Sequence, residues 1–401
     1  MSSVCLYFEV HQPYRLKPYT FFDISRDHRY FDEKANREIL RKVATKCYLP
    51  ANEAILRLID KHKGRFRVAY SLTGIAIEQL TAYAPEALRS FQALSETGCV
   101  EFLGETYYHS LASIYDEADF VAQVRQHGDL MRRLFRQSPR IFRNTELVYN
   151  DRTGALVKQM GFEGMLAEGA DDILEWRSPN FVYRSTTPGL RLLLKNYRLS
   201  DDVAFRFSNR SWDEFPLTAE KFANWIHRVS GNGDVVNLFM DYETFGEHQW
   251  EATGIFDFLQ HLPDRVFAHP DWDFCTPSEA VERYSPVAQL SFPRTVSWAD
   301  VGRDLTAWDG NHMQRGAIRQ IYDLVNDVKR MNNPETTDIW RKLQTSDHFY
   351  YMCTKWSSDG DVHKYFSPYN GPYEAFITYM NILTDFREWV VGNMSVASRS
   401  A

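Results

Sequence analysis

The sequence has few cysteines and no spacing that would join them. The cysteines are odd in number and scattered, and none belongs to a C-x-x-C pair. Neither a disulfide framework nor a cysteine metal site is therefore indicated, and a reducing cytoplasm is the compartment that we expect. The five cysteines are Cys5, Cys47, Cys99, Cys275 and Cys353.

Long runs of basic or apolar residues are also missing. The formal net charge is -7, and without a basic cluster the chain offers no electrostatic footprint for nucleic acid or an anionic membrane surface. Residues 1–13 lack the basic segment that begins a secretion signal, and we find no membrane span. We expect a cytoplasmic protein with no nucleic-acid partner and no membrane partner, and the oligomeric state is left open.

Several catalytic motifs are absent. The sequence contains no G-x-S-x-G elbow and no G-x-x-x-x-G-K phosphate loop. The glycines at 231–233 come before an expected strand rather than after one, which favours a turn over a dinucleotide site. The histidines His11, His109, His248 and His312 lie near strand ends or motif clusters without H-x-H or H-E-x-x-H spacing. We therefore expect no metal ion and no cofactor.

The composition is that of an ordinary globular protein with many aromatic rings. Hydrophobic residues make up 44% and charged residues 25%, which is enough to bury a sizeable core. Aromatic residues reach 15%. Such rings fill cores, and they also stack on the apolar faces of sugars; composition alone leaves both interpretations open.

Short apolar runs alternate with helical patterns, which predicts parallel strands joined by crossover helices. Seven or eight such units favour a closed α/β barrel, with an open doubly wound sheet as the competing fold. Helices are expected, for example, at 51–62 and 116–137. The expected strands are 4–10, 66–72, 99–103, 141–145, 164–167, 191–195, 235–240 and a weaker one near 272–275.

After about residue 290 the pattern becomes purely helical. Segments 313–331, 337–344 and 373–391 carry apolar residues at helical spacing. We therefore predict a barrel domain at residues 1–290 and a helical domain at residues 291–401.

Ionisable side chains follow four of the expected strands. His11, Glu105, Glu146 and Asp241 each come at or just after a strand end, and strand ends of a parallel barrel converge on one face. An acidic residue after a strand usually caps a helix or faces solvent, so each one alone is weak evidence. Glycoside cleavage needs two carboxyl groups, however, and two acids on different strands can supply them.

These strand-end motifs resemble glycoside hydrolase family 57. The matching motifs occur in order along most of the chain. They are His11-Gln12-Pro13, Gly104-Glu105 with His109, Thr145-Glu146, Asp241-Tyr242-Glu243 with Gly246-Glu247, and Ser297-Trp298 through Arg303-Asp304, Trp308 and Gly310-Asn311.

The resemblance implies a distorted (β/α)7 barrel, a helical domain that completes the cleft, and a retaining mechanism on α-glucans. Glu146 then matches the nucleophile and Asp241 the general acid/base. The implied substrate-binding residues are His11, Glu105, His109, Glu243 and Asp304, with Trp298 and Trp308 as sugar platforms.

Within the family, segments 196–202 and 346–350 look most like the α-amylase subgroup. Asp309 departs from the apolar residue expected after Trp308, so the cleft wall there is expected to differ. A 4-α-glucanotransferase or branching enzyme with the same acid pair is the nearest alternative. A non-catalytic glucan-binding relative is a second, and a metal-dependent deacetylase or mannosidase, recognisable by inhibition with a chelator, is a third.

Overall fold

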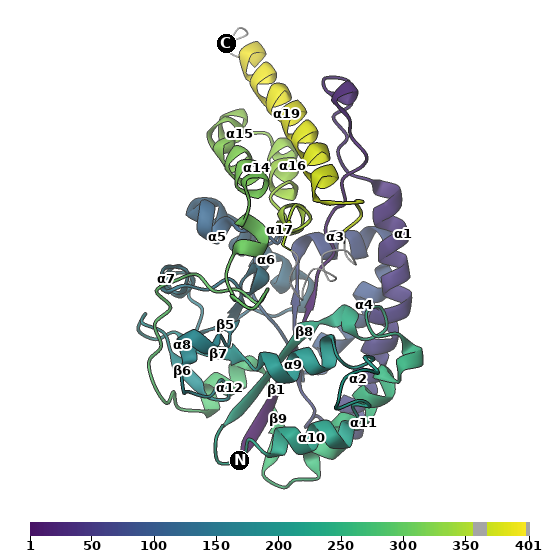
Figure 1. Cartoon of the computed structure of the whole chain (residues 1–401), viewed down its shortest axis with the longest axis vertical. Coiled ribbons are helices and arrows are strands. Elements are labelled where there is room, and N and C mark those ends of the chain that lie inside the picture. Colours follow the sequence, from purple (N-terminus) through teal and green to yellow (C-terminus); the bar gives the residue numbers. More distant parts are fainter. Residues whose placement is uncertain (356–366, 398–401) are drawn as a thin grey trace.

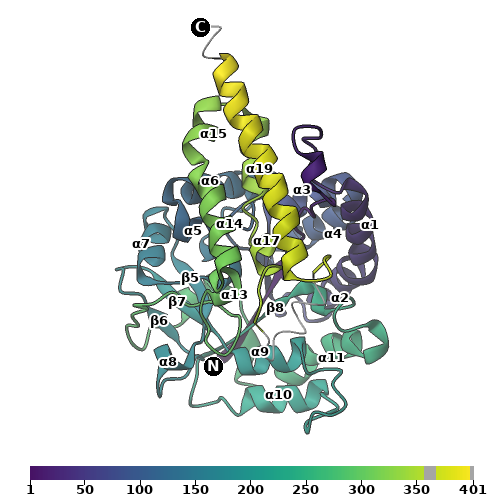
Figure 2. The same cartoon turned by 45° about the horizontal axis from the view of Figure 1, so that its top comes forward.

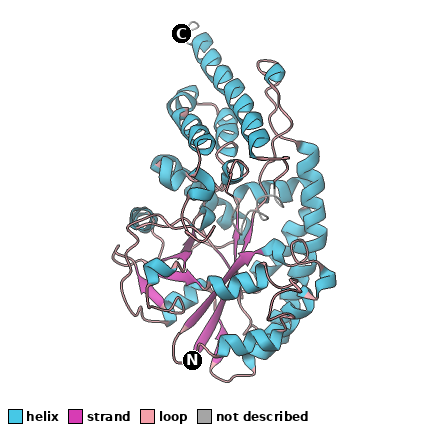
Figure 3. Ribbon diagram, in the orientation of Figure 1, coloured by secondary structure: helices cyan, strands magenta, loops and turns pink. Residues whose placement is uncertain are grey.

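The computed structural model describes residues 1–355 and 367–397 (Figure 1). Helices surround a central group of strands in this part of the chain (Figure 3). The strands are β1 (Ser2–Val10), β2 (Val68–Leu72), β3 (Val100–Phe102), β4 (Ile141–Arg143), β5 (Gly164–Glu168), β6 (Val182–Arg184), β7 (Arg191–Lys195), β8 (Val235–Asp241) and β9 (Trp272–Phe274).

The strands form two sheets whose edges meet. One sheet has the order β3-β2-β1-β8 and the other β4-β5-β7-β6. Gly104 joins β3 to β4, because its N–H donates to the carbonyl of Ile141 at 2.9 Å and its carbonyl accepts from the N–H of Arg143 at 2.8 Å. The N–H of Asn196 donates to the carbonyl of Asn237 at 2.9 Å and joins the end of β7 to β8. Seven strands thus close into the predicted distorted barrel. The competing prediction of an open doubly wound sheet is wrong.

Two strands lie outside this ring. The weak strand expected near residues 272–275 is β9, which pairs in parallel with the first residues of β1. The sequence pattern did not predict β6, a three-residue strand that pairs antiparallel with β7. It carries too few residues to show an alternating pattern.

Crossover helices connect the barrel strands. The two helices predicted at 51–62 and 116–137 are α2 and α6, each a residue or two different at its ends. Asp116 caps α6 by accepting from the N–H of Asp119, as an N-cap aspartate does. The helices of this part are α1 (Glu33–Val43), α2 (Leu49–Lys61), α3 (Gly74–Tyr83), α4 (Pro85–Glu96), α5 (Ala112–Tyr115), α6 (Glu117–Phe135), α7 (Asp151–Gln159), α8 (Asp171–Leu174), α9 (Tyr197–Ala204), α10 (Ala219–His227), α11 (Ile255–Phe267) and α12 (Pro277–Arg283).

The last described part of the chain is helical and lies beyond the ends of the barrel strands, at the top of Figures 1 and 2. The helix predicted at 313–331 is divided in two after Asp323. The segments 337–344 and 373–391 belong to longer or shifted helices. The helices are α13 (Thr306–Asp309), α14 (His312–Asp323), α15 (Val325–Met331), α16 (Pro334–Lys342), α17 (Ser346–Tyr350) and α19 (Pro372–Ala397).

One hydrophobic core joins these helices to the barrel. Phe142 of β4 and Leu192 of β7 belong to the same buried cluster as Trp308, Phe349 and Tyr379 of the helical part. The predicted boundary near residue 290 therefore does not separate two independent cores, and the division into domains stays a prediction. No helix among the described residues is long and apolar enough to cross a membrane.

Gly104 provides a test of barrel closure. A Cβ added there would lie 2.6 Å from the Phe162 ring, so we expect Gly104→Ala to lower the free energy of unfolding by about 1–3 kcal/mol. Gly128 in α6 is the control, because a Cβ there meets nothing closer than 3.6 Å. Gly128→Ala is expected to be neutral or to stabilise by up to about 1 kcal/mol. Urea unfolding of both variants measures the difference, and equal stabilities would contradict this account.

Candidate active site

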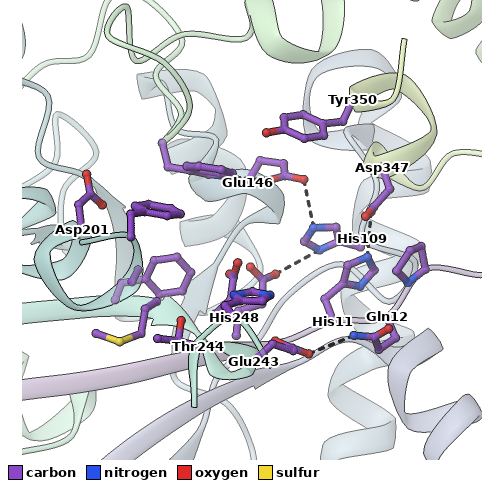
Figure 4. Close-up of a pocket in the computed structure, with 18 of the residues that line it drawn as sticks. His11, Gln12, His109, Glu146, Asp201, Glu243, Thr244, His248, Asp347 and Tyr350 are labelled. Carbon is purple, nitrogen blue, oxygen red and sulfur yellow. Dashed lines mark hydrogen bonds and ion pairs between the residues drawn. The ribbon is translucent and has the colours of Figure 1, made fainter. Parts of the chain in front are cut away.

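A cavity lies at the carboxyl ends of the barrel strands, where the helical part meets them (Figure 4). Its empty volume is ≈ 1110 Å³ when the open mouth is included. The wall carries six carboxylates against one lysine and one arginine. The ionisable residues that line it are Glu9, His11, Arg15, His109, Glu146, Lys195, Asp201, Asp241, Glu243, His248 and Asp347.

Glu146 is held by hydrogen bonds from three directions. The Nε1–H of Trp298 donates to its Oε2 at 2.8 Å. The hydroxyl of Ser346 donates to its Oε1 at 2.7 Å, and Nε2 of His109 lies 3.3 Å from the same oxygen. Both carboxylate oxygens therefore have a fixed position, with only 9% of the residue exposed.

The backbone at Glu146 is also constrained. Glu146 and the following Leu147 have φ of 57° and 51°, in the left-handed region that costs energy for residues with a side chain. The hydroxyl of Ser297 donates to the carbonyl of Glu146 at 2.7 Å. This contact holds the turn that places the carboxylate in the cavity.

The surroundings keep Glu146 ionised. Burial alone would raise its pKa, but His109 and Trp298 outweigh burial and the charge of Asp347, so that the pKa is lowered. A carboxylate that stays ionised and fixed in place is suited to act as a nucleophile.

Asp241 has the opposite electrostatic environment. It is the last residue of β8 and is paired in register with Glu9 of β1, so two acids stand side by side on neighbouring strands. Burial raises the pKa of Asp241, and the charge of Glu146 adds to this rise against the effect of Arg143. The pKa of Glu146 is therefore lowered, whereas that of Asp241 is raised.

His109 sits among three carboxylates. Its Nε2 lies 3.3 Å from Glu146, and its Nδ1 lies 3.4 Å from Glu9 and 3.9 Å from Glu105. Burial would lower its pKa, but these carboxylates raise it well above the ordinary value. His109 is therefore an imidazolium that balances the charge of Glu146, and Figure 4 draws the dashed contacts that lead from its ring.

A buried ion pair lies on the other side of Glu9. The guanidinium of Arg143 forms two hydrogen bonds with the Glu9 carboxylate and lies 5.1 Å above the ring of Phe239. Burial raises the pKa of Glu9, and Arg143 and His109 act against that rise. The two buried cations Arg143 and His109 thus offset the negative charges of Glu9, Glu105 and Glu146.

His11 is neutral and fixed by two partners. Burial and the neighbouring His109 lower its pKa. Its Nε2 lies 2.9 Å from Asp347, and because a carboxylate can only accept, the Nε2–H of His11 donates this hydrogen bond. Its Nδ1 then accepts from the hydroxyl of Thr73 at 3.1 Å. The ring stacks on that of His109 with centroids 3.9 Å apart.

Glu243 is another acid of the cavity with a shifted pKa. Burial and the neighbouring Asp241 raise the pKa of Glu243 to about 8. Its Oε1 accepts hydrogen bonds from the hydroxyl of Tyr48 and from Nε2 of Gln12. Near neutral pH it is protonated, and it can offer that proton to a ligand oxygen.

Two sets of side chains have the composition of metal ligands: His11, His109 and Asp347, and Glu9, Glu105 and His109. In this arrangement, however, the four ring nitrogens of His11 and His109 each lie within 3.4 Å of a protein oxygen. The two rings are also stacked face to face. Both ring nitrogens of His11 are thus engaged in hydrogen bonds, whereas Nδ1 of His109 makes no hydrogen bond with the described residues and lies at ion-pair distance from Glu9 and Glu105.

The structure brings most of the predicted site residues together. Glu146, Asp241, His11, His109, Glu243 and Trp298 line the cavity. Glu105 does not: it is fully buried behind His109. Asp304 lies in the wall of a separate open pocket and accepts a hydrogen bond from the N–H of Thr306.

Trp308 differs from the expectation of a sugar platform. It has 0% exposed surface and packs edge-on against Trp298 with centroids 6.3 Å apart. Because Trp308 is buried in the core, it supports the Trp298 ring by packing against it. Asp309, where the sequence departs from the family pattern, accepts a hydrogen bond from the hydroxyl of Tyr115 at 3.3 Å.

Several residues of the site were not predicted from the sequence. Glu9 and Arg143 stand inside strands that are otherwise buried, and a charge in such a strand needs a buried partner, which was a usable signal. Ser346 and Asp347 were noted only as part of a resembling segment. No local pattern links them to the barrel, because they lie 200 residues and more beyond Glu146 and His11.

A closed α/β barrel with an acidic cavity at the carboxyl ends of its strands has the architecture of a barrel enzyme. A model of the family described as Glycosyl hydrolase family 57 matches residues 5–293. The chain is also 43% identical over 399 residues to the protein named "Putative alpha-amylase" of Methanocaldococcus jannaschii, covering 96% of this chain and 84% of the relative. The chain therefore belongs to glycosyl hydrolase family 57, a family of glycosidases.

Solved structures share the fold over nearly the whole chain. The branching enzyme of Pyrococcus horikoshii has a TM-score of 0.69 at 15% identity, covering 96% of this chain and 88% of that one. The Thermotoga maritima α-amylase AmyC has a TM-score of 0.64 at 14% identity, covering 98% and 94%. The 4-α-glucanotransferase of Thermococcus litoralis has a TM-score of 0.68 at 14% identity, but this chain spans only 60% of its length. At these identities the likeness shows the fold alone.

The ion pair of Glu9 and Arg143 generates a prediction. Arg143→Met leaves a buried carboxylate without its partner, which costs about 3–5 kcal/mol of stability. Adding Glu9→Gln removes that charge, so the double variant is expected to regain about 1–3 kcal/mol. Urea unfolding midpoints of the wild type, both single variants and the double variant measure this. Strictly additive losses would contradict a direct interaction.

Proposed function

We propose that this protein is a retaining α-glucan hydrolase of the α-amylase type. The observation that carries the proposal is the contrast between two acids in one cavity. Glu146 is fixed by hydrogen bonds with a lowered pKa, whereas Asp241 has a raised pKa. A retaining glycosidase needs such a pair, with one ionised nucleophile and one protonated acid.

In the proposed mechanism, Asp241 donates its proton to the glycosidic oxygen while Glu146 attacks the anomeric carbon. The bond between that carbon and the glycosidic oxygen breaks, and the leaving sugar departs with the proton. Asp241, now a carboxylate, takes a proton from water, whose oxygen attacks the same carbon and releases Glu146. His109 stays charged throughout and stabilises Glu146 whenever its negative charge is restored.

Similar proteins support an α-glucan as substrate. The relative with 43% identity bears the name of an α-amylase, and the solved structures with the same fold include an α-amylase, a branching enzyme and a 4-α-glucanotransferase. The Trp298 ring at the cavity offers the flat apolar surface on which a sugar ring can stack. Glu243 offers a hydrogen-bonding group for its hydroxyls, and His11 contributes to the cavity wall beside it.

The role of Glu146 can be tested by a conservative change. Glu146→Gln keeps the shape of the side chain but removes the nucleophile, so we expect turnover of maltoheptaose to fall by roughly 10³-fold or more. Calorimetric binding of maltoheptaose is expected to stay within about threefold, because the cavity is preserved. Glu86→Gln, a change at an exposed carboxylate of α4, serves as the control. Unchanged turnover in Glu146→Gln would reject the assignment.

The acceptor separates hydrolysis from glucan transfer. With maltoheptaose and soluble starch, a hydrolase produces new reducing ends in proportion to bonds cleaved. A 4-α-glucanotransferase or branching enzyme with the same acid pair redistributes chain lengths or adds branches without a net gain of reducing ends. We expect a net gain, measured by a reducing-end assay beside chromatographic chain profiles. Longer products with no gain would favour transfer, and binding without any product would favour a non-catalytic glucan-binding protein.

A further inference from the structure

We infer that Ser346 is a positioning residue for the nucleophile, delivered to the barrel by helix α17 of the helical part. This inference rests on the proposed role of Glu146. It assigns to the chain beyond the barrel a part in the reaction that is exerted through Glu146, the residue to which Ser346 is hydrogen-bonded.

The hydroxyl of Ser346 can have only one orientation. Its Oγ lies 2.7 Å from Oε1 of Glu146, and a carboxylate oxygen can only accept. The single hydroxyl hydrogen is therefore donated to Glu146. Ser346 is fully buried, so water cannot replace this donor without a rearrangement of the site.

Backbone contacts fix α17 against the barrel. The N–H of Ser346 donates to the carbonyl of His109 at 2.9 Å. The hydroxyl of Thr345 donates to the carbonyl of Tyr108 at 3.0 Å, and Thr345 forms an antiparallel bridge with Ser110. The loop that contains His109 thus also holds α17 in place by hydrogen bonds. The positions of His109 and Ser346, the two donors to Oε1 of Glu146, are therefore coupled.

Asp347, the next residue of α17, increases the need for the Ser346 hydroxyl because its negative charge lies near Glu146. Asp347 is held by Nε2 of His11 at 2.9 Å, and its charge raises the pKa of Glu146. The helix thus brings a destabilising charge and a stabilising donor to the nucleophile together. Other titratable groups that act on Glu146 are His109 from the loop after β3, Asp241 of β8 and Tyr351, which follows α17.

Removing the hydroxyl should therefore raise the pKa of Glu146. A hydrogen bond to a charged group contributes enough to shift a carboxylate by about one pH unit. We expect Ser346→Ala to move the acidic limb of the kcat/KM profile upward by about one pH unit. We also expect kcat at the optimum to fall by roughly 10- to 100-fold, because one oxygen of the nucleophile loses its fixed position.

Two further variants separate positioning from packing. Ser346→Cys fills the same space with a weak donor, so its acidic limb is expected to lie between those of the wild type and Ser346→Ala. Ser185→Ala removes another buried hydroxyl, which contacts Tyr149 and not Glu146, and it should leave the profile unchanged. An unshifted acidic limb in Ser346→Ala would overturn the inference, as would equal shifts in Ser346→Ala and Ser185→Ala.

Covalent trapping distinguishes this inference from the proposed function. A fluorinated glucosyl fluoride should label Glu146 in the wild type, and peptide mass spectrometry locates the label. If the wild type is labelled elsewhere or not at all, the proposed nucleophile fails. If Glu146 is labelled in the wild type and at the same rate and pH dependence in Ser346→Ala, only the role of Ser346 fails. We expect slower labelling in Ser346→Ala with an acidic limb shifted upward.

Discussion

The site depends on the sharing of two buried cations among neighbouring carboxylates. His109 lies between Glu146 and Glu9, and Arg143 pairs with Glu9 from the other side. Buried carboxylates repel one another and lose hydration, so they can coexist only with such partners. This balance keeps Glu146 ionised and leaves Asp241, which forms no ion pair within the described residues, with a raised pKa.

The same interactions tie together segments that are distant in sequence. Glu9, His109, Arg143 and Asp241 come from or directly follow different barrel strands, whereas Trp298 and Ser346 come from the chain beyond the barrel. A parallel barrel brings strand ends to one face, and the helical part closes that face over Glu146. Precise placement of Glu146 therefore results from the whole fold and not from a local motif.

The sequence predicted much of the fold because its signals were local. The apolar runs of β1, β5, β7 and β8 and the caps of α6 are encoded in adjacent residues, and the resemblance to a family supplied the seven-stranded closure. The strand β6 and the division between α14 and α15 were missed, since three-residue strands and short kinks leave little periodic pattern.

For the site, the acid pair was predicted to meet, and the structure places Glu146 and Asp241 in one cavity. The positions of Glu105, Asp304 and Trp308 could not be predicted, because exposure to a cavity depends on which side chain packs in front of another. His109 stands before Glu105, and Trp298 before Trp308. Which of two side chains lies nearer the cavity is set by tertiary packing, about which a single sequence carries no direct signal.

The hydrophobic core that spans the barrel and the helical part has a consequence for evolution. Modules that recombine freely among proteins have separate cores and few contacts across their boundary. Here Phe142 and Leu192 share a core with Trp308, Phe349 and Tyr379, so exchange of the helical part for an unrelated one would strip the barrel of part of its interior. Sequence change on either side of residue 290 must therefore be accommodated on the other, and the two parts are expected to be inherited together.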